Sequence, residues 1–145
     1  MALITWVILD CLRVLVWPAD HGSASQLVFQ TRDELSKVWV ADGGKEADIP
    51  AIDFEKETVV AVFSGQKNSG GYSIKIERIL SQKRGSVESI VVLFRETVPT
   101  PGSMQTRALT FPGHVVVIQK SVAKFSFVNV DSDEAQQFKP WMEKN

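Results

Sequence analysis

Residues 58–64 read TVVAVFS, a continuous apolar run that is rich in β-branched side chains. Branching at Cβ favours extended backbone, and seven residues is the length of a strand rather than of a helix. Because polar residues do not alternate with the apolar ones, both faces of this strand must be covered. We therefore expect residues 58–64 to form the central strand of a sheet.

The segments around this strand have the pattern of half-buried strands. Tyr72, Ile74 and Ile76 alternate with polar residues, which is typical of a strand with one face in the core. Further strands are expected at residues 12–17, 26–30, 87–95, 115–119 and 123–130, with a polar hairpin tip at residues 81–86. Proline–glycine pairs at 101–102 and 112–113 predict two type II turns.

One good helix is expected, over residues 31–41. Thr31 and Glu34 have the spacing of a capping box, in which each side chain accepts from the other residue's backbone amide. An apolar face follows at helical spacing, and Gly43 ends the helix. With so many short strands, the sequence predicts a mainly β fold, an antiparallel β-sandwich-like or open-barrel domain with one packed α-helix.

The apolar positions of these strands supply the expected core. We predict that it contains Val59, Val60, Val62, Tyr72, Ile74, Ile76, Val92, Phe94, Leu109, Val116, Ile118, Phe125 and Phe127.

Composition and charge describe one ordinary globular domain. The 145 residues are 44% hydrophobic and 23% charged, and they carry a formal net charge of −1. A domain of this size needs no metal or disulfide to stabilise its core, and this charge favours no nucleic-acid partner. Cys11 is the single cysteine, and neither His21 nor His114 has a partner at metal-ligand spacing. We interpret both histidines as structural or surface residues and expect no metal and no cofactor.

Residues 1–25 leave two interpretations open. The apolar start MALITWVILDCLRVLVW is interrupted by Asp10 and Arg13, so it falls short of the ~20 residues of a membrane span, and we expect no transmembrane segment. Because no Lys or Arg precedes the apolar run, it lacks the form of a clean signal peptide. The segment is either a degenerate export signal or one or two strands that open the fold, and we favour strands.

The remainder is interpreted as part of the same single domain, residues 1–145. Residues 26–130 form the main β domain, and residues 131–145 form a polar tail. A short helix is expected at residues 131–138, where Pro140 closes it.

The segment GQKNSGGY at residues 65–72 stands out as a candidate site. Its glycines have the spacing of a phosphate-binding loop, but Gly71 and Tyr72 occupy the positions where that loop requires Lys and Ser or Thr. No nucleophile motif occurs, and the acidic residues at 53, 55 and 57 fit an exposed strand entry. We therefore expect no catalytic residues and predict that the chain is not an enzyme.

Two blocks of sequence resemble the C-terminal domain of the protease-complex subunit PrcB family. They are GQKNSGGYSI at residues 65–74, which follows the apolar strand, and VPTPGSMQTRALTFPGHVVVI at residues 98–118. QLVFQTRDELSKVW at residues 26–39 resembles the family's entry into its helix, so the similarity covers about residues 26–127. The resemblance implies a non-catalytic binding or accessory domain of bacterial envelope or secreted proteins, with a protein partner such as a protease subunit.

A fainter likeness gives an alternative function. NSGGY at residues 68–72 is similar to the N-P-T-T-G-Y loop of chagasin-like cysteine-protease inhibitors, although the proline and the first threonine are missing. This likeness implies an inhibitor that presents residues 65–72 to the cleft of a protease.

Residues 65–72 are predicted to be a recognition surface, against the alternative of a flexible connector. A hairpin needs only two to five linking residues, and this connection is longer. Glycines there would let the backbone approach a partner closely. The predicted binding residues are Gly65, Gln66, Lys67, Asn68, Ser69, Gly70, Gly71 and Tyr72.

Overall fold

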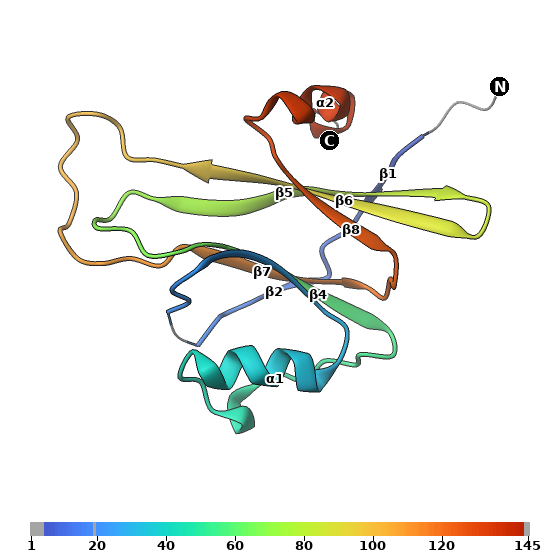
Figure 1. Cartoon of the computed structure of the whole chain (residues 1–145), viewed down its shortest axis with the longest axis horizontal. Coiled ribbons are helices and arrows are strands. Elements are labelled where there is room, and N and C mark those ends of the chain that lie inside the picture. The colour runs from blue at the N-terminus through green and yellow to red at the C-terminus, as the bar shows by residue number, and fades with distance from the viewer. Residues whose placement is uncertain (1–4, 19, 144–145) are drawn as a thin grey trace.

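A computed structural model describes residues 5–18 and 20–143 and shows two four-stranded sheets packed face to face (Figure 1). Sheet A has the strand order β1-β5-β6-β8 and sheet B the order β2-β7-β4-β3. The strands are β1 (Val7–Leu9), β2 (Arg13–Leu15), β3 (Ala24–Phe29), β4 (Glu57–Ser64), β5 (Ser73–Arg84), β6 (Val87–Thr97), β7 (Gly113–Gln119) and β8 (Lys124–Asn129). The helical elements are α1 (Arg32–Ala41), η1 (Glu46–Asp48), η2 (Asp133–Phe138) and α2 (Lys139–Met142).

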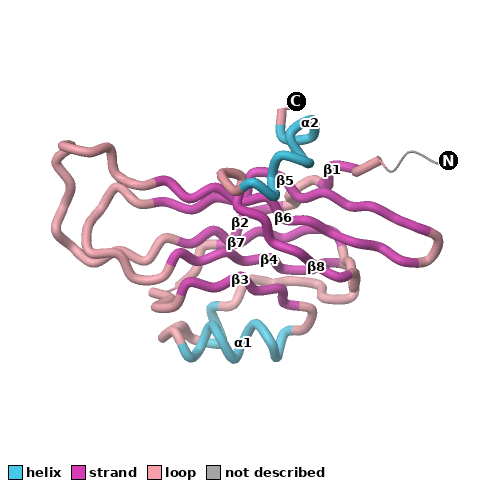
Figure 2. Tube along the Cα trace, turned by 45° about the horizontal axis from the view of Figure 1, so that its top comes forward, coloured by secondary structure: helices cyan, strands magenta, loops and turns pink. Residues whose placement is uncertain are grey.

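The helices cover the outer faces of the two sheets. Helix α1 lies against sheet B, and the C-terminal helices lie over sheet A, so the molecule has four layers (Figure 2). The predicted mainly β, sandwich-like fold with one packed helix is confirmed, and both sheets are open.

Strand β4 lies in the middle of sheet B, between β3 and β7. Every residue from 58 to 64 is buried, as the apolar run predicts. Val59, Ala61 and Phe63 point toward α1, whereas Val60 and Val62 point toward sheet A. The strand thus contributes to two cores at once, because alternate side chains leave opposite faces.

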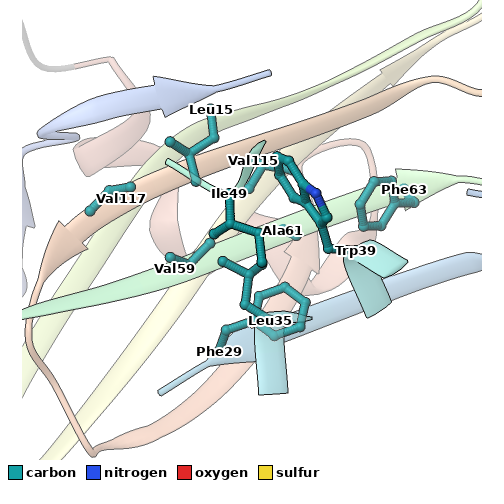
Figure 3. Close-up of a cluster of buried hydrophobic side chains, with 10 residues drawn as sticks. All are labelled: Leu15, Phe29, Leu35, Trp39, Ile49, Val59, Ala61, Phe63, Val115 and Val117. Carbon is teal, nitrogen blue, oxygen red and sulfur yellow. The ribbon is translucent and has the colours of Figure 1, made fainter. Parts of the chain in front are cut away.

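The buried side chains form three clusters, one in each space between layers. The first lies between sheet B and α1 and includes Leu35 and Trp39 (Figure 3). The second lies between the sheets, and the third lies under the C-terminal helices. Two predicted core residues do not belong there: Leu109 is 55% exposed and Tyr72 is half-buried, since both lie in loops rather than in strands.

Strands β5 and β6 form a hairpin that is longer than predicted. The expected polar tip at residues 81–86 is wrong, because the ladder continues to the pair Arg84–Val87 and leaves only Gly85 and Ser86 in the turn. Backbone pairing needs no apolar side chains, so the polar residues 82–84 extend the strand into solvent. Gly85 has a φ of 62°, which suits a two-residue hairpin turn.

One pair in sheet A is parallel rather than antiparallel. After β6 the chain enters sheet B as β7 and returns to sheet A as β8, which lies parallel to β6. This crossover through the opposite sheet is what lets two neighbouring strands run in the same direction.

Helix α1 begins at its predicted cap. The Thr31 hydroxyl accepts from the Glu34 amide at 3.2 Å, as a capping box requires. The Glu34 carboxylate, however, accepts from the Thr31 hydroxyl at 3.2 Å and not, as predicted, from the Thr31 amide. Gly43 follows the helix with a φ of 103°, so the predicted glycine stop is confirmed.

The N-terminal segment pairs with both sheets. The strand predicted at residues 12–17 is β2, which pairs with β7 in sheet B, and β1 precedes it and pairs with β5 in sheet A, in agreement with the one or two opening strands that we favoured. Arg13 fixes β2 through an ion pair with Glu57 at 2.5 Å and a bond to the Ala51 carbonyl at 3.0 Å. Among residues 5–18 and 20–143, no helix has the length and apolar character needed to span a membrane.

The C-terminal segment differs from its prediction in one respect. Residues 133–138 form a 3-10 helix that places Ala135 and Phe138 in the third core cluster. Pro140 does not close this helix but lies in the first turn of α2, where a missing amide hydrogen costs nothing.

Candidate functional site

The segment at residues 65–72 joins the two sheets. It leaves β4 in sheet B and enters β5 in sheet A, so it is not the hairpin connection that the sequence suggested. Its length follows from the distance between stacked sheets, about 10 Å, and does not by itself indicate a recognition role. The role of residues 65–72 must therefore be inferred from their contacts.

A second loop, residues 98–112, lies beside the first at the same end of the sandwich (Figure 1). We call residues 65–72 the first loop, residues 98–112 the second loop, and both together the loop pair. Lys67 and Thr110 form an antiparallel bridge with N–O distances of 2.8 and 2.9 Å, and the Gly70 amide donates to the Thr106 carbonyl at 3.0 Å. The two loops are therefore a single hydrogen-bonded unit.

Two glycines of the first loop allow this close approach. A Cβ on Gly70 would lie 2.7 Å from the Thr106 hydroxyl, and one on Gly71 would lie 2.6 Å from the Gln105 amide oxygen. Gly71 also has a φ of 87°, which favours glycine. The glycines thus allow close contact with the second loop, and their predicted contact with a partner stays a prediction.

The other predicted binding residues divide into exposed and buried ones. Gln66 and Asn68 are exposed, as expected. Lys67 is half-buried, with its ammonium group 5.4 Å from the centre of the Tyr72 ring. Gly65 is buried, and Ser69 is half-buried, with its carbonyl accepting from the Thr110 hydroxyl at 2.7 Å.

The second loop presents apolar side chains to solvent. Met104 is 98% exposed, and Val98 and Leu109 are also exposed. The tip beside Met104 is held by the predicted turn at residues 100–103, in which the Ser103 amide donates to the Thr100 carbonyl at 3.0 Å and Gly102 has a φ of 82°. An ordered loop with exposed apolar residues is suited to protein contact.

The sequence analysis did not assign the second loop to the site. Its length was a usable signal, because unstructured connections beyond about 12 residues are usually functional or disordered. The second predicted turn, at residues 112–113, is wrong. Gly113 begins β7 opposite Phe63, and a Cβ there would lie 2.6 Å from the Phe63 ring, so this glycine is needed for packing.

Residues 58–119 match the family model described as PrcB C-terminal. Over this range the chain is similar to the PrcB C-terminal domain, so we call the domain PrcB-like. The match runs from β4 to β7 and includes both loops, whereas α1 and parts of β3 and β8, which fall in the range of the sequence resemblance, lie outside it. No curated protein and no solved structure matches the chain.

His114 lies at the base of the loop pair of this PrcB-like domain. It is the second residue of β7, and its Nδ1 accepts from the Ile76 amide of β5 at 2.9 Å. The bond joins the two sheets and requires Nδ1 to carry no proton. Burial lowers the pKa of His114 below its ordinary value, the Lys75 ammonium lowers it further, and the Glu77 carboxylate opposes the shift.

We expect acid to destabilise the PrcB-like domain through His114. Because the folded state lowers this pKa, the unfolded chain binds the proton more readily, and stability falls as pH drops below about 6.5. Denaturant unfolding at pH 7.5 and pH 5.0 measures this loss. His114→Gln should reduce it, since an amide oxygen can accept from Ile76 at either pH. An equal loss in both proteins would contradict the assignment.

A second cluster of polar side chains was not foreseen in the sequence analysis. His21, which we interpreted as a structural or surface residue, contacts Asp42 at 2.7 Å and Ser25 at 2.9 Å. Ser25 lies four residues after His21, but Asp42 is distant in sequence and contacts His21 because it lies at the end of α1. No local motif therefore signals the cluster. Over residues 5–18 and 20–143, no group of three or more His, Cys, Asp or Glu side chains could hold a metal ion.

Proposed function

We propose that this PrcB-like domain is a protein-binding accessory module and that the loop pair is its binding surface. The observation that carries the proposal is the loop pair itself, in which backbone hydrogen bonds fix two loops while Val98, Met104 and Leu109 stay exposed. A pre-organised loop loses little conformational entropy when it binds. This role requires no catalytic group.

The family context supports a protease-complex subunit as the partner. The name of the matching family refers to the C-terminal part of PrcB, and the match includes both loops. The resemblance found in the sequence supports a bacterial envelope or secreted setting for the same complex. The surface chemistry is consistent with a protein partner, because most exposed side chains of the loop pair are apolar or uncharged, as at residues 66, 68 and 104, and Arg107 adds an exposed charge of a type that is common at protein interfaces.

A site-specific crosslinking experiment tests the proposal. A photoreactive amino acid is placed at residue 104 of the full chain, the protein is irradiated in extract of the source cells, and the adduct is identified by mass spectrometry. The identified partner is then purified and titrated calorimetrically with the variants below. The partner is expected to crosslink at residue 104 and not at residue 87, which lies at the other end of β6.

Two matched variants locate the surface. We expect the triple variant Val98→Ser, Met104→Ser and Leu109→Ser to weaken binding at least ~10-fold, since apolar anchors contribute more than about 1 kcal/mol each. The control Val87→Ser and Val122→Ser changes two equally exposed side chains away from the loop pair and should leave affinity unchanged. An unchanged affinity of the triple variant would refute the proposal.

The inhibitor alternative stays a prediction and has its own assay. Inhibition of papain by micromolar wild-type protein, abolished in the triple variant, would replace an accessory role by a protease-inhibitory one at the same surface. Full papain activity would remove that alternative.

A further inference from the structure

Ser25, His21 and Asp42 form a continuous chain of hydrogen bonds. The Ser25 hydroxyl oxygen lies 2.9 Å from Nε2 of His21, and Nδ1 of the same ring lies 2.7 Å from Oδ2 of Asp42. A nucleophile within hydrogen-bond reach of a base, with the base oriented by a third group, is the arrangement that activates serine in hydrolases. The loop pair plays no part in this chain.

The hydrogen-bond pattern determines where the protons lie. The indole N–H of Trp17 donates to Oδ2 of Asp42 at 2.9 Å, so this oxygen acts as an acceptor. With the aspartate as an acceptor, Nδ1 of His21 carries the proton of the neutral ring. Nε2 then presents its lone pair to the Ser25 hydroxyl and can remove its proton. The Ser23 carbonyl, 3.1 Å from the same hydroxyl oxygen, is a second acceptor that helps to hold it.

Three rigid elements hold the chain in place. Asp42 caps the C-terminal end of α1, and Ser25 is paired with Phe63 between β3 and β4. The His21 ring packs against the Phe63 ring with centroids 4.3 Å apart. The side chains of His21 and Asp42 are only 15% and 13% exposed, which strengthens their interaction, whereas Ser25 is half-buried and reaches solvent.

A cavity lies beside the cluster. Its volume is about 440 Å³, and it shares Trp17 and Phe63 with the surroundings of His21. Asp20, the residue before His21, also lines it, together with Pro18 and Phe111. Ligand sites commonly have volumes of ~300–1,000 Å³, so the space is large enough for a small molecule.

We propose that Ser25 is a nucleophile activated by His21 and oriented by Asp42, and that it accepts the acyl group of small carboxylic esters. Ser25 Oγ bonds to the carbonyl carbon while its proton passes to Nε2 of His21. The bond from carbon to the alcohol oxygen breaks, and the alcohol leaves with that proton. Water then attacks the acyl-serine through the same base, releases the carboxylic acid, and Ser25 recovers its proton. This activity goes beyond the proposed binding role.

Labelling with a fluorophosphonate tests the nucleophile directly. The reagent forms a bond from Ser25 Oγ to phosphorus and expels fluoride, and the proton passes to His21. Intact-mass spectrometry of the full chain gives the rate, and peptide mapping gives the site. We expect one adduct on wild-type protein, located at Ser25, and a pre-steady-state burst of p-nitrophenol from p-nitrophenyl acetate.

The variants separate activation from simple exposure. Ser25→Ala should abolish the adduct, and His21→Gln should slow labelling by about 100-fold or more, since a general base contributes ~10²–10⁴-fold. Asp42→Asn should also slow labelling. It provides the comparison if a thermal melt shows that the His21→Gln protein is unfolded. Ser126→Ala, which removes an exposed hydroxyl of β8, should label at the wild-type rate. An absent Ser25 adduct, or wild-type labelling rates in both folded His21 and Asp42 variants, would overturn the proposal.

Discussion

Replacing Trp39 by alanine is expected to lower the free energy of unfolding by about 3–5 kcal/mol, the range for a buried tryptophan. Trp39 is only 2% exposed and lies in the core between α1 and sheet B (Figure 3). Its ring meets the Trp17 ring edge-on at 5.2 Å, and its indole N–H donates to the Lys45 carbonyl at 2.9 Å. The substitution removes apolar contacts and leaves the Lys45 carbonyl without its donor.

Denaturant unfolding measures this loss, and the next residue of α1 supplies the control. Val40 is 48% exposed, so Val40→Ala should change stability by less than about 0.5 kcal/mol. Trp39→Phe should fall between the two, because it keeps an aromatic ring but loses the bond to Lys45. Equal stability of the Trp39→Ala and Val40→Ala proteins would show that α1 does not pack on sheet B as described.

Replacing Ile118 by alanine should destabilise the domain by about 2–5 kcal/mol. Ile118 lies in β7 opposite Thr58, is fully buried, and belongs to the cluster between the two sheets. Its neighbours come from both sheets, and they cannot collapse onto the missing side chain without breaking strand pairing. The resulting cavity accounts for the upper part of the range.

The shift in the denaturant midpoint measures the Ile118→Ala effect. Val122→Ala is the control, since Val122 lies four residues further along the chain and is largely exposed. Near-wild-type stability of the Ile118 variant would contradict face-to-face packing of the sheets, whereas a matching loss in the Val122 variant would point to a general effect on the segment after β7.

Local patterns were sufficient to predict most elements of this fold. The apolar run at residues 58–64 predicted a strand covered on both faces, and the Thr31 cap predicted the start of α1, because both signals depend only on neighbouring residues. Assignment of strands to sheets depends on contacts that are distant in sequence. For that reason the link between β4 and β5 was taken for a hairpin, and the parallel pairing of β6 with β8 was not foreseen.

The candidate site was predicted only in part, for the same reason. The glycines drew attention to the first loop, and Gln66 and Asn68 are exposed as expected. The partner of that loop, residues 98–112, became evident only from the bridge between Lys67 and Thr110. The Ser25–His21–Asp42 chain depends on where α1 ends relative to β3, which no spacing along the sequence encodes.

The double pairing of the N-terminal segment has a consequence for biosynthesis. Residues 7–9 pair with residues 79–81, and residues 13–15 pair with residues 115–117. On the ribosome, β1 and β2 therefore cannot pair until residues 79–81 and 115–117 have been synthesised. Such long-range pairing raises contact order, which slows folding. Until they pair, the apolar residues of β1 and β2 are exposed and can be bound by chaperones. We expect the central strands of the domain to pair first, and residues 7–9 and 13–15 to be among the last to pair.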